Sequence, residues 1–173
     1  LTGHHRRLPC YCCFDRRGAV FRILDGMDLI MRGYFEIGII NGKTPSNLGT
    51  LWRSAYQLGA AGIFVIGNRY HRQSSDTVKA YRHIPFREFN DFEHFQSSRP
   101  YGCMLIGIEM GGRPLSGYGH PERAIYLLGA EDNGLPKNVI EKCQSIISLE
   151  SVNTASYNVA VAGSLVMYHR QFK

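Results

Sequence analysis

The sequence predicts an α/β fold in which a mostly parallel sheet is covered by helices on both faces. Short runs of continuous apolar residues alternate with helical segments along most of the chain. Continuous runs, in place of strict alternation, are typical of strands that are buried on both faces. The 173 residues are enough for one domain with a full core. A hydrophobic content of 44% excludes a disordered chain.

The regular pattern begins at Tyr34. Residues 34–40 (YFEIGII) predict a buried strand, and residues 61–67 (AGIFVIG) predict a second one. Between them, residues 48–59 place their large apolar side chains on one helical face and end in glycine, which predicts a helix. This strand–helix–strand order is what a parallel sheet requires.

The second half of the chain repeats the pattern. Residues 103–109, 124–129 and 145–149 are apolar runs that predict three further strands. Residues 135–143 predict a helix with Pro136 in its first turn, where the missing N–H has little consequence.

A last helix is predicted near the end of the chain, in the sequence TASYNVAVAGSLVMYHR. Its apolar residues are small, which favours close packing. Ser156 and Asn158 precede them, and we expect both to cap this helix, because their side-chain oxygens accept hydrogen bonds from free helical N–H groups.

The charge of the chain is basic and unevenly distributed. The formal net charge is +6, and residues 69–87 hold five basic residues against one acidic residue. Such a segment favours a polyanionic partner such as nucleic acid. The alternative is a solvated surface loop.

Several classes of protein are disfavoured. No apolar run approaches the roughly 20 residues of a membrane span, and the basic N-terminus has no apolar signal core, so we expect no membrane association. Five cysteines, an odd number, favour reduced thiols and a cytoplasmic location. The glycine-bearing turns IGIEMGG and LLGAEDNG match neither a P-loop nor a dinucleotide fingerprint, which argues against a Rossmann oxidoreductase.

Residues 1–32 show neither strand nor helix periodicity. We interpret them as an extension, a tag remnant or a mis-started reading frame, separate from a domain over residues 33–173. The stretch contains two histidines and two cysteines that resemble half of a zinc site, namely His4, His5, Cys10 and Cys13. Because no second cysteine pair follows at a workable spacing, we expect no metal.

Three segments carry a resemblance to a known family. They are residues 47–60 (NLGTLWRSAYQLGA), 125–136 (IYLLGAEDNGLP) with 145–150 (SIISLE), and 155–168 (ASYNVAVAGSLVMY). In this order they resemble the SPOUT superfamily, specifically the SpoU/TrmH-type RNA ribose 2′-O-methyltransferases. The resemblance covers about residues 34–172. It implies an S-adenosylmethionine-dependent enzyme that modifies tRNA or rRNA, with a deep C-terminal trefoil knot and a homodimeric assembly.

The resemblance also implies which residues bind the methyl donor. In the family, the backbone of three loops holds it. These loops match Gly107 and Ile108, the turn at Gly129, and the segment from Leu149 to Tyr157. Tyr157 stands where the family usually has Leu or Met, and EDNG stands where E-G-x-G is common.

The polar site residues of the family also have matches, which are Asn47, Arg53, Glu131, Ser156 and Asn158. We predict that the Arg53 guanidinium, whose pKa lies above about 12, binds the target phosphate and ribose, with proton removal left to that phosphate or to solvent. The two asparagines would hold the arginine and the ribose, and Glu131 would orient the arginine or the loop.

Simpler interpretations of these residues exist. Asn47 is equally typical of a helix N-cap, Arg53 of a solvated helix position, and Glu131 of a turn residue. The RNA contacts are expected in the basic segment, from the residues Arg69, Arg72, Lys79 and Arg82. Two alternatives to ribose methylation stay open. One is methylation of another RNA position, and the other is a non-catalytic RNA-binding or assembly protein with the same fold.

Overall fold

The computed structural model divides the chain into two compact units, Leu1–Gly33 and Tyr34–Lys173. The residues that it describes are 21–24, 27–30, 33–67, 82–153 and 155–173. In the first unit, β1 (Phe21–Leu24) pairs with β2 (Met27–Ile30) in an antiparallel hairpin. The sequence pattern of residues 1–32 predicts neither a strand nor a helix in this unit. The dipeptide Asp25-Gly26 is the sequence signal that could have predicted this hairpin, because Asp-Gly favours tight hairpin turns.

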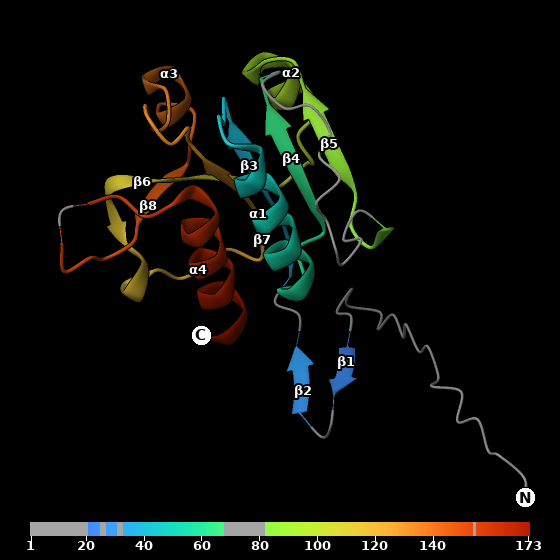
Figure 1. Ribbon diagram of the computed structural model, residues 1–173. Coiled ribbons are helices and arrows are strands. Elements are labelled where there is room, and N and C mark those ends of the chain that lie inside the picture. Colours follow the sequence, from blue (N-terminus) through green and yellow to red (C-terminus); the bar gives the residue numbers. More distant parts are fainter. Residues whose placement is uncertain (1–20, 25–26, 31–32, 68–81, 154) are drawn as a thin grey trace, which may run out of the picture. The chain divides into compact units, whose positions relative to one another are not determined.

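The second unit is built on a six-stranded parallel sheet with the order β5-β4-β3-β7-β6-β8 (Figure 1). The strands are β3 (Tyr34–Ile40), β4 (Gly62–Ile66), β5 (Phe86–Phe89), β6 (Met104–Pro114), β7 (Arg123–Leu128) and β8 (Ser145–Ser148). The helices are α1 (Pro45–Gln57), α2 (Phe92–Ser97), α3 (Lys137–Ile140) and α4 (Val159–Phe172), with a 3₁₀ turn at Leu115–Gly117.

Successive residues of the central strands enter two different cores. Ile37 of β3 and Tyr126 of β7 belong to one core with Leu51 of α1. The neighbouring Ile125 of β7 belongs to the other core, with Phe95 of α2. Each of these side chains is fully buried. The prediction of a parallel sheet with helices on both faces is therefore confirmed, whereas the trefoil knot stays a prediction.

Close contact between α1 and α4 depends on small residues, as the sequence predicted. A Cβ at Gly163 would lie 2.5 Å from Leu51 Cδ1, so any larger residue would force the Leu51 side chain or the helices to shift. The hydroxyl of the next residue, Ser164, donates a hydrogen bond of 2.7 Å to Ser54 Oγ. These contacts hold the middle parts of the two helices side by side (Figure 1).

The helix predicted over residues 135–143 is wrong in length, because α3 has only four residues. Pro136 stands directly before it as its N-cap. The chain turns away after α3, since the Gln144 N–H donates to the Leu105 carbonyl (2.9 Å) and the Gln144 side chain accepts from the Leu105 N–H (2.7 Å). Tertiary pairing with β6 thus ends a segment that has a helical sequence pattern.

Two other boundaries differ from the predictions. The first helix begins at Pro45, because proline is well suited to a first helical turn. Strand β6 continues to Pro114, with an irregularity in its pairing to β8 between Ile108 and Arg113. Within the described part of the chain, no helix is long and apolar enough to cross a membrane.

Candidate functional site

A cavity of about 550 Å³ opens where β7 and β8 end and where the pairing of β6 with β7 ends. Its walls come from residues 108–111, from residues 128–134, and from residues between Ser148 and Ala162. Ligands of open parallel sheets bind outside the carboxyl ends of the strands, and this volume is in the usual range for small-molecule sites. The cavity is therefore the candidate site for a small organic ligand.

The turn after β7 is closed tightly by glycines. Ala130 and Gly134 exchange two backbone hydrogen bonds, of 3.2 and 2.9 Å. Gly134 has a φ of +62°, and a Cβ at Gly129 would lie 2.1 Å from the Gly134 carbonyl carbon. Glycine is needed at both positions, and the closed turn directs the intervening residues 131–133 to the cavity wall.

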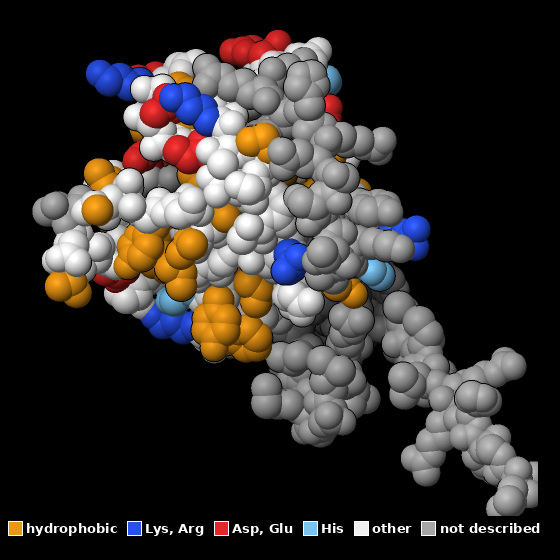
Figure 2. Space-filling model, in the orientation of Figure 1, with side chains coloured by type: hydrophobic (Ala, Val, Ile, Leu, Met, Phe, Trp, Pro, Cys, Tyr) orange, Lys and Arg blue, Asp and Glu red, His pale blue; other side chains and the backbone are white. Residues whose placement is uncertain are grey.

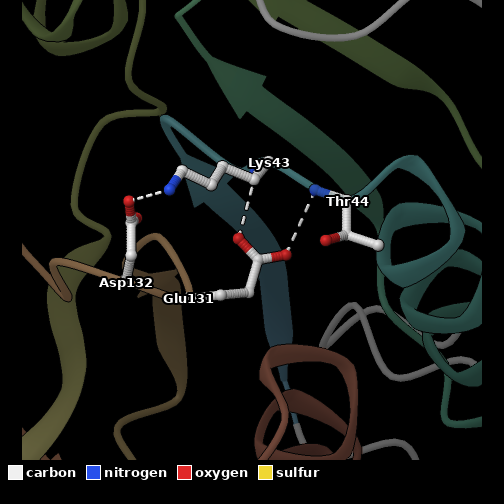
Figure 3. Close-up of polar contacts among 4 residues, drawn as sticks. All are labelled: Lys43, Thr44, Glu131 and Asp132. Atoms are coloured by element: carbon white, nitrogen blue, oxygen red, sulfur yellow. Dashed lines mark hydrogen bonds and ion pairs between the residues drawn. The ribbon is translucent and has the colours of Figure 1, made fainter.

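Glu131 ties this turn to the connection between β3 and α1. Its carboxylate accepts hydrogen bonds from the backbone N–H groups of Lys43 (3.0 Å) and Thr44 (3.3 Å) (Figure 3). It also accepts one from Asn47 Nδ2, at 2.7 Å. Burial alone would raise the pKa of Glu131, but the donated N–H bonds outweigh burial and lower that pKa. Beside it, the Lys43 ammonium forms an ion pair with Asp132.

A second contact brings in the start of α4. Asn158 Nδ2 donates a hydrogen bond of 3.0 Å to Asn47 Oδ1. Asn158 Oδ1 accepts from the N–H groups of Ala160 (2.9 Å) and Val161 (3.3 Å), which makes Asn158 the N-cap of α4. Glu131, Asn47 and Asn158 therefore form one hydrogen-bonded chain that joins all three segments of the sequence resemblance.

Two capping expectations need correction. Ser156 does not cap α4, since Asn158 takes that position, and Ser156 instead lines the cavity two residues earlier. Asn47 is not the N-cap of α1. That position belongs to Thr44, because the chain turns into the helix before Pro45, and the Asn47 side chain is engaged by Glu131 and Asn158.

Four of the five residues predicted to bind the donor line the cavity, namely Ile108, Gly129, Leu149 and Tyr157. The Tyr157 hydroxyl also donates to the Glu150 carbonyl, at 3.0 Å, which closes the loop before α4. Gly107 lies elsewhere. A Cβ there would meet the side chains of Ile146 and Leu135 at 2.6 and 2.8 Å, so this glycine allows the core to pack beneath the cavity.

Arg53 is not among the residues that line the cavity of its own chain. It is an exposed residue of α1, six positions after Asn47. Six residues of α-helix correspond to a rise of about 9 Å and place the two side chains about 120° apart around the axis. Within one chain, Glu131 and Ser156 line the cavity. Asn47 and Asn158 do not line it, but they are joined to Glu131 by hydrogen bonds, whereas Arg53 lies on a different side of α1.

Three of the four residues predicted to contact RNA lie outside the residues that the structure describes. Arg69, Arg72 and Lys79 fall in the undescribed residues 68–81, and Arg82 is described and exposed. Next to Arg82, the ring of His83 stacks on Tyr56 of α1, with 4.5 Å between ring centroids. The half-zinc motif near the N-terminus is also outside the described residues, and those that are described contain no cluster suited to a metal.

The sequence interpretation missed Glu109, the last residue of the predicted strand 103–109. One of its carboxylate oxygens accepts from the Met110 N–H (2.9 Å) and the other from the Leu135 N–H (2.7 Å). It lines the cavity with Glu131 and Asp132. An acidic residue where a buried parallel strand ends was the available signal.

Comparisons with known proteins identify the family of the chain. A family model of the SpoU rRNA Methylase family matches residues 35–168. The chain is 29% identical over 135 residues to the mouse tRNA (guanosine(18)-2′-O)-methyltransferase TARBP1, covering 72% of this chain and 8% of that protein. It is 25% identical over 142 residues to an uncharacterized tRNA/rRNA methyltransferase of Archaeoglobus fulgidus, covering 79% and 63%. The chain thus spans less than two thirds of both relatives.

The fold has solved counterparts. A crystal structure of an AdoMet-bound rRNA methyltransferase from Sinorhizobium meliloti superposes with a TM-score of 0.71 and 23% identity, over 80% of this chain and 56% of that one. This likeness shows the same fold. Together with the match over residues 35–168, it leads to one conclusion: the chain belongs to the SpoU rRNA methylase family.

Proposed function

We propose that the protein is an S-adenosylmethionine-dependent RNA methyltransferase that modifies a ribose 2′-hydroxyl in tRNA or rRNA. The observation that carries this proposal is the hydrogen-bonded chain Glu131–Asn47–Asn158, which joins three distant segments beside one cavity. Family membership supports the reaction class, and the name of the mouse relative supports the ribose oxygen as the acceptor.

The cavity fits the donor in both shape and charge. Apolar side chains of Ile108, Leu128 and Leu149 line it and suit an adenine ring, and the backbone of the turn that begins at Gly129 lines the same cavity and offers polar groups. The ionised side chains on its wall are carboxylates, which suit a cationic ligand. When bound, the donor supplies a methyl group on a positively charged sulfur that serves as its own leaving group.

The asparagines act by holding the walls of the site. Asn47 and Asn158 are bonded to each other and to Glu131 or the α4 backbone, so their role is to fix the β7 turn against the start of α4. Ser156 is exposed and lines the cavity, which supports our proposal that its hydroxyl binds the ribose. Holding the acceptor oxygen in line with the methyl carbon supplies much of the acceleration.

The proposed assembly is a homodimer formed through α4. Four residues of this helix, Val161, Leu165, Tyr168 and Phe172, are 40–59% exposed and share one helical face. Figure 2 shows hydrophobic side chains gathered over this part of the molecule. Together with an adjacent hollow of about 400 Å³, they form an apolar surface of the kind that marks an interface.

A dimer also gives Arg53 a place in the reaction. Because Arg53 does not line the cavity of its own chain, we propose that it serves the cavity of the partner copy. Its planar guanidinium suits bidentate binding of an RNA phosphate next to the target ribose. The phosphates of the RNA would further contact Arg82 and the basic residues before it.

The proposal places the protein in the cytoplasm, where RNA substrates and reduced thiols occur together. Within the described residues, Cys103 and Cys143 are both free. Burial raises the pKa of the Cys143 thiol to about 11, so this residue is unreactive.

Transfer from donor labelled in its methyl group to total RNA tests the proposal. Alkaline hydrolysis cleaves RNA at free 2′-hydroxyls, so a methylated ribose leaves label in an alkali-resistant dinucleotide. We expect label in this product. Label in alkali-released mononucleotides would indicate base methylation, and RNA binding without transfer would indicate the non-catalytic alternative.

A further inference from the structure

The ionisable side chains of the cavity wall are all of one sign. Three lining residues carry ionisable side chains, and all are acidic, namely Glu109, Glu131 and Asp132. No lysine, arginine or histidine of the described residues is part of this wall. A partly enclosed wall of one sign raises the local preference for ligands of the opposite charge.

The three carboxylates are not equivalent. Asp132 is paired with the Lys43 ammonium, so its charge is offset. Within the described part of the chain, the donors to Glu131 are uncharged N–H groups: the backbone of Lys43 and Thr44, its own backbone and the Asn47 amide. Glu109 likewise accepts from the backbone of Met110 and Leu135. Neutral donors hold a carboxylate in place without cancelling its charge.

Glu109 is fixed in position from two sides. One of its oxygens accepts from Met110, the next residue of β6, and the other from Leu135, which lies 26 residues away at the end of the turn after β7. A Cβ at Gly134 would lie 2.3 Å from Glu109 Oε2, so this glycine leaves space for the carboxylate. The family resemblance assigned no role to Glu109, and the proposed transfer does not use it.

We propose that the Glu109 carboxylate makes the cavity select the cationic methyl donor over the uncharged thioether product. The inference rests on the proposed function. S-adenosylmethionine carries a net positive charge, whereas S-adenosylhomocysteine carries none, and the two differ in little else. Transfer of the methyl group therefore removes the charge that Glu109 attracts, which favours release of the product and binding of new donor.

Calorimetric titration of the full chain with each of the two molecules tests this role. The quantity to compare is the ratio of the Kd for S-adenosylhomocysteine to the Kd for S-adenosylmethionine. We expect Glu109→Gln to lower this ratio about fivefold, as expected for loss of one charge several ångströms from a cation in a partly solvated cavity. Glu122→Gln is the matched control, because Glu122 is exposed beside the other end of β7, and its ratio should equal that of the wild type.

A second variant separates the charge of Glu109 from the hydrogen bonds by which Glu109 holds the chain at Met110 and Leu135. Glu109→Asp keeps the charge but shortens the side chain, so both affinities fall while the ratio stays at the wild-type value. If Glu109→Gln binds neither molecule, the ratio of the two Kd values measured for Glu109→Asp tests the inference in its place. An equal loss of affinity for both molecules in Glu109→Gln, or a lowered ratio in Glu109→Asp, overturns the inference. A wild-type chain that binds neither molecule overturns the proposed function itself. If the wild-type chain binds both molecules, the Glu109 variants test the role of Glu109 separately from the proposed function.

Discussion

The side-chain amide of Asn158 donates a hydrogen bond of 3.0 Å to Asn47 Oδ1, although the two residues lie 111 positions apart. Asn47 is only 9% exposed, and its own amide donates to Glu131. A buried asparagine that uses both ends of its amide has one acceptable orientation. The contact therefore fixes how the start of α1, the β7 turn and the start of α4 meet beside the cavity.

Asn158 has two functions that substitutions can separate. Asn158→Asp keeps an oxygen that caps α4 but loses the donor to Asn47, whereas Asn158→Ala loses both. We expect Asn158→Asp to retain most of the thermal stability and to weaken donor binding about tenfold or more. Asn158→Ala should in addition lose about 1 kcal/mol of unfolding free energy. Thermal unfolding and calorimetry measure the two effects.

Asn90→Asp is a matched control for these variants, because it makes the same chemical change at an exposed residue between β5 and α2. Its donor affinity should equal that of the wild type. Full donor affinity in Asn158→Asp would show that the contact with Asn47 does not shape the cavity.

Arg53 is expected to act across the dimer. Arg53→Ala and Asn158→Asp chains should each be nearly inactive alone. A mixture that is dissociated and reassembled should regain a substantial fraction of wild-type methyl transfer, because mixed dimers contain one cavity with an intact wall and an intact Arg53 from the other chain. Transfer to RNA before and after mixing is the measurement. A mixture no more active than its components would place Arg53 and the cavity on the same chain, or Arg53 outside the reaction.

The apolar stripe on α4 predicts the assembly. Leu165→Glu places a charge in the centre of this stripe and should convert a dimer into a monomer, because burying an unpaired carboxylate is unfavourable. Light scattering after size-exclusion chromatography measures the mass. Asn138→Glu adds the same charge on the exposed side of α3 and should leave the dimer intact. A monomeric wild-type chain at micromolar concentration would rule out this interface.

Glu131 predicts a loss of stability in acid. Its pKa in the folded protein lies below the ordinary value of 4.5, because N–H donors outweigh burial. A lowered pKa means that its contribution is complete above pH 4.5 and is lost as the pH falls through the folded-state pKa. Glu131→Gln should therefore be less stable than the wild type near neutral pH and should show a smaller further loss between pH 5 and pH 3, in the range set by the lowered pKa.

Chemical denaturation at several pH values measures this dependence. Glu93→Gln is a suitable reference, because Glu93 is an exposed residue of α2. Parallel curves for the wild type and Glu131→Gln in acid would contradict the role given to the N–H donors of the β3–α1 connection.

The fold was largely predictable because its strands are continuous apolar runs that few other structures accommodate. Residues 34–40 coincide with β3 for this reason. The segment 135–143 has a helical pattern, yet Gln144 pairs with Leu105 and ends α3 early. Such long-range pairing overrides local preference and is not visible in a window of sequence.

The site was predictable by residue type but not by geometry. Asn47, Glu131 and Asn158 were selected from motifs, and the structure joins them. The exclusion of Arg53 from its own cavity depends on helix rotation, which the spacing of two residues does not convey. The role of Glu109 depends on the Leu135 N–H, 26 residues away, and follows only from the folded turn.

Binding of S-adenosylmethionine to the purified chain, measured by calorimetry, tests the central claim most directly. If the walls formed by residues 108–111, 128–134 and 148–162 make one donor site, each chain should bind one molecule with an affinity in the micromolar range, and Asn158→Asp should weaken that binding. Absence of binding at millimolar ligand, from a folded wild-type chain, would contradict the claim and favour an RNA-binding protein that has kept the fold without the chemistry.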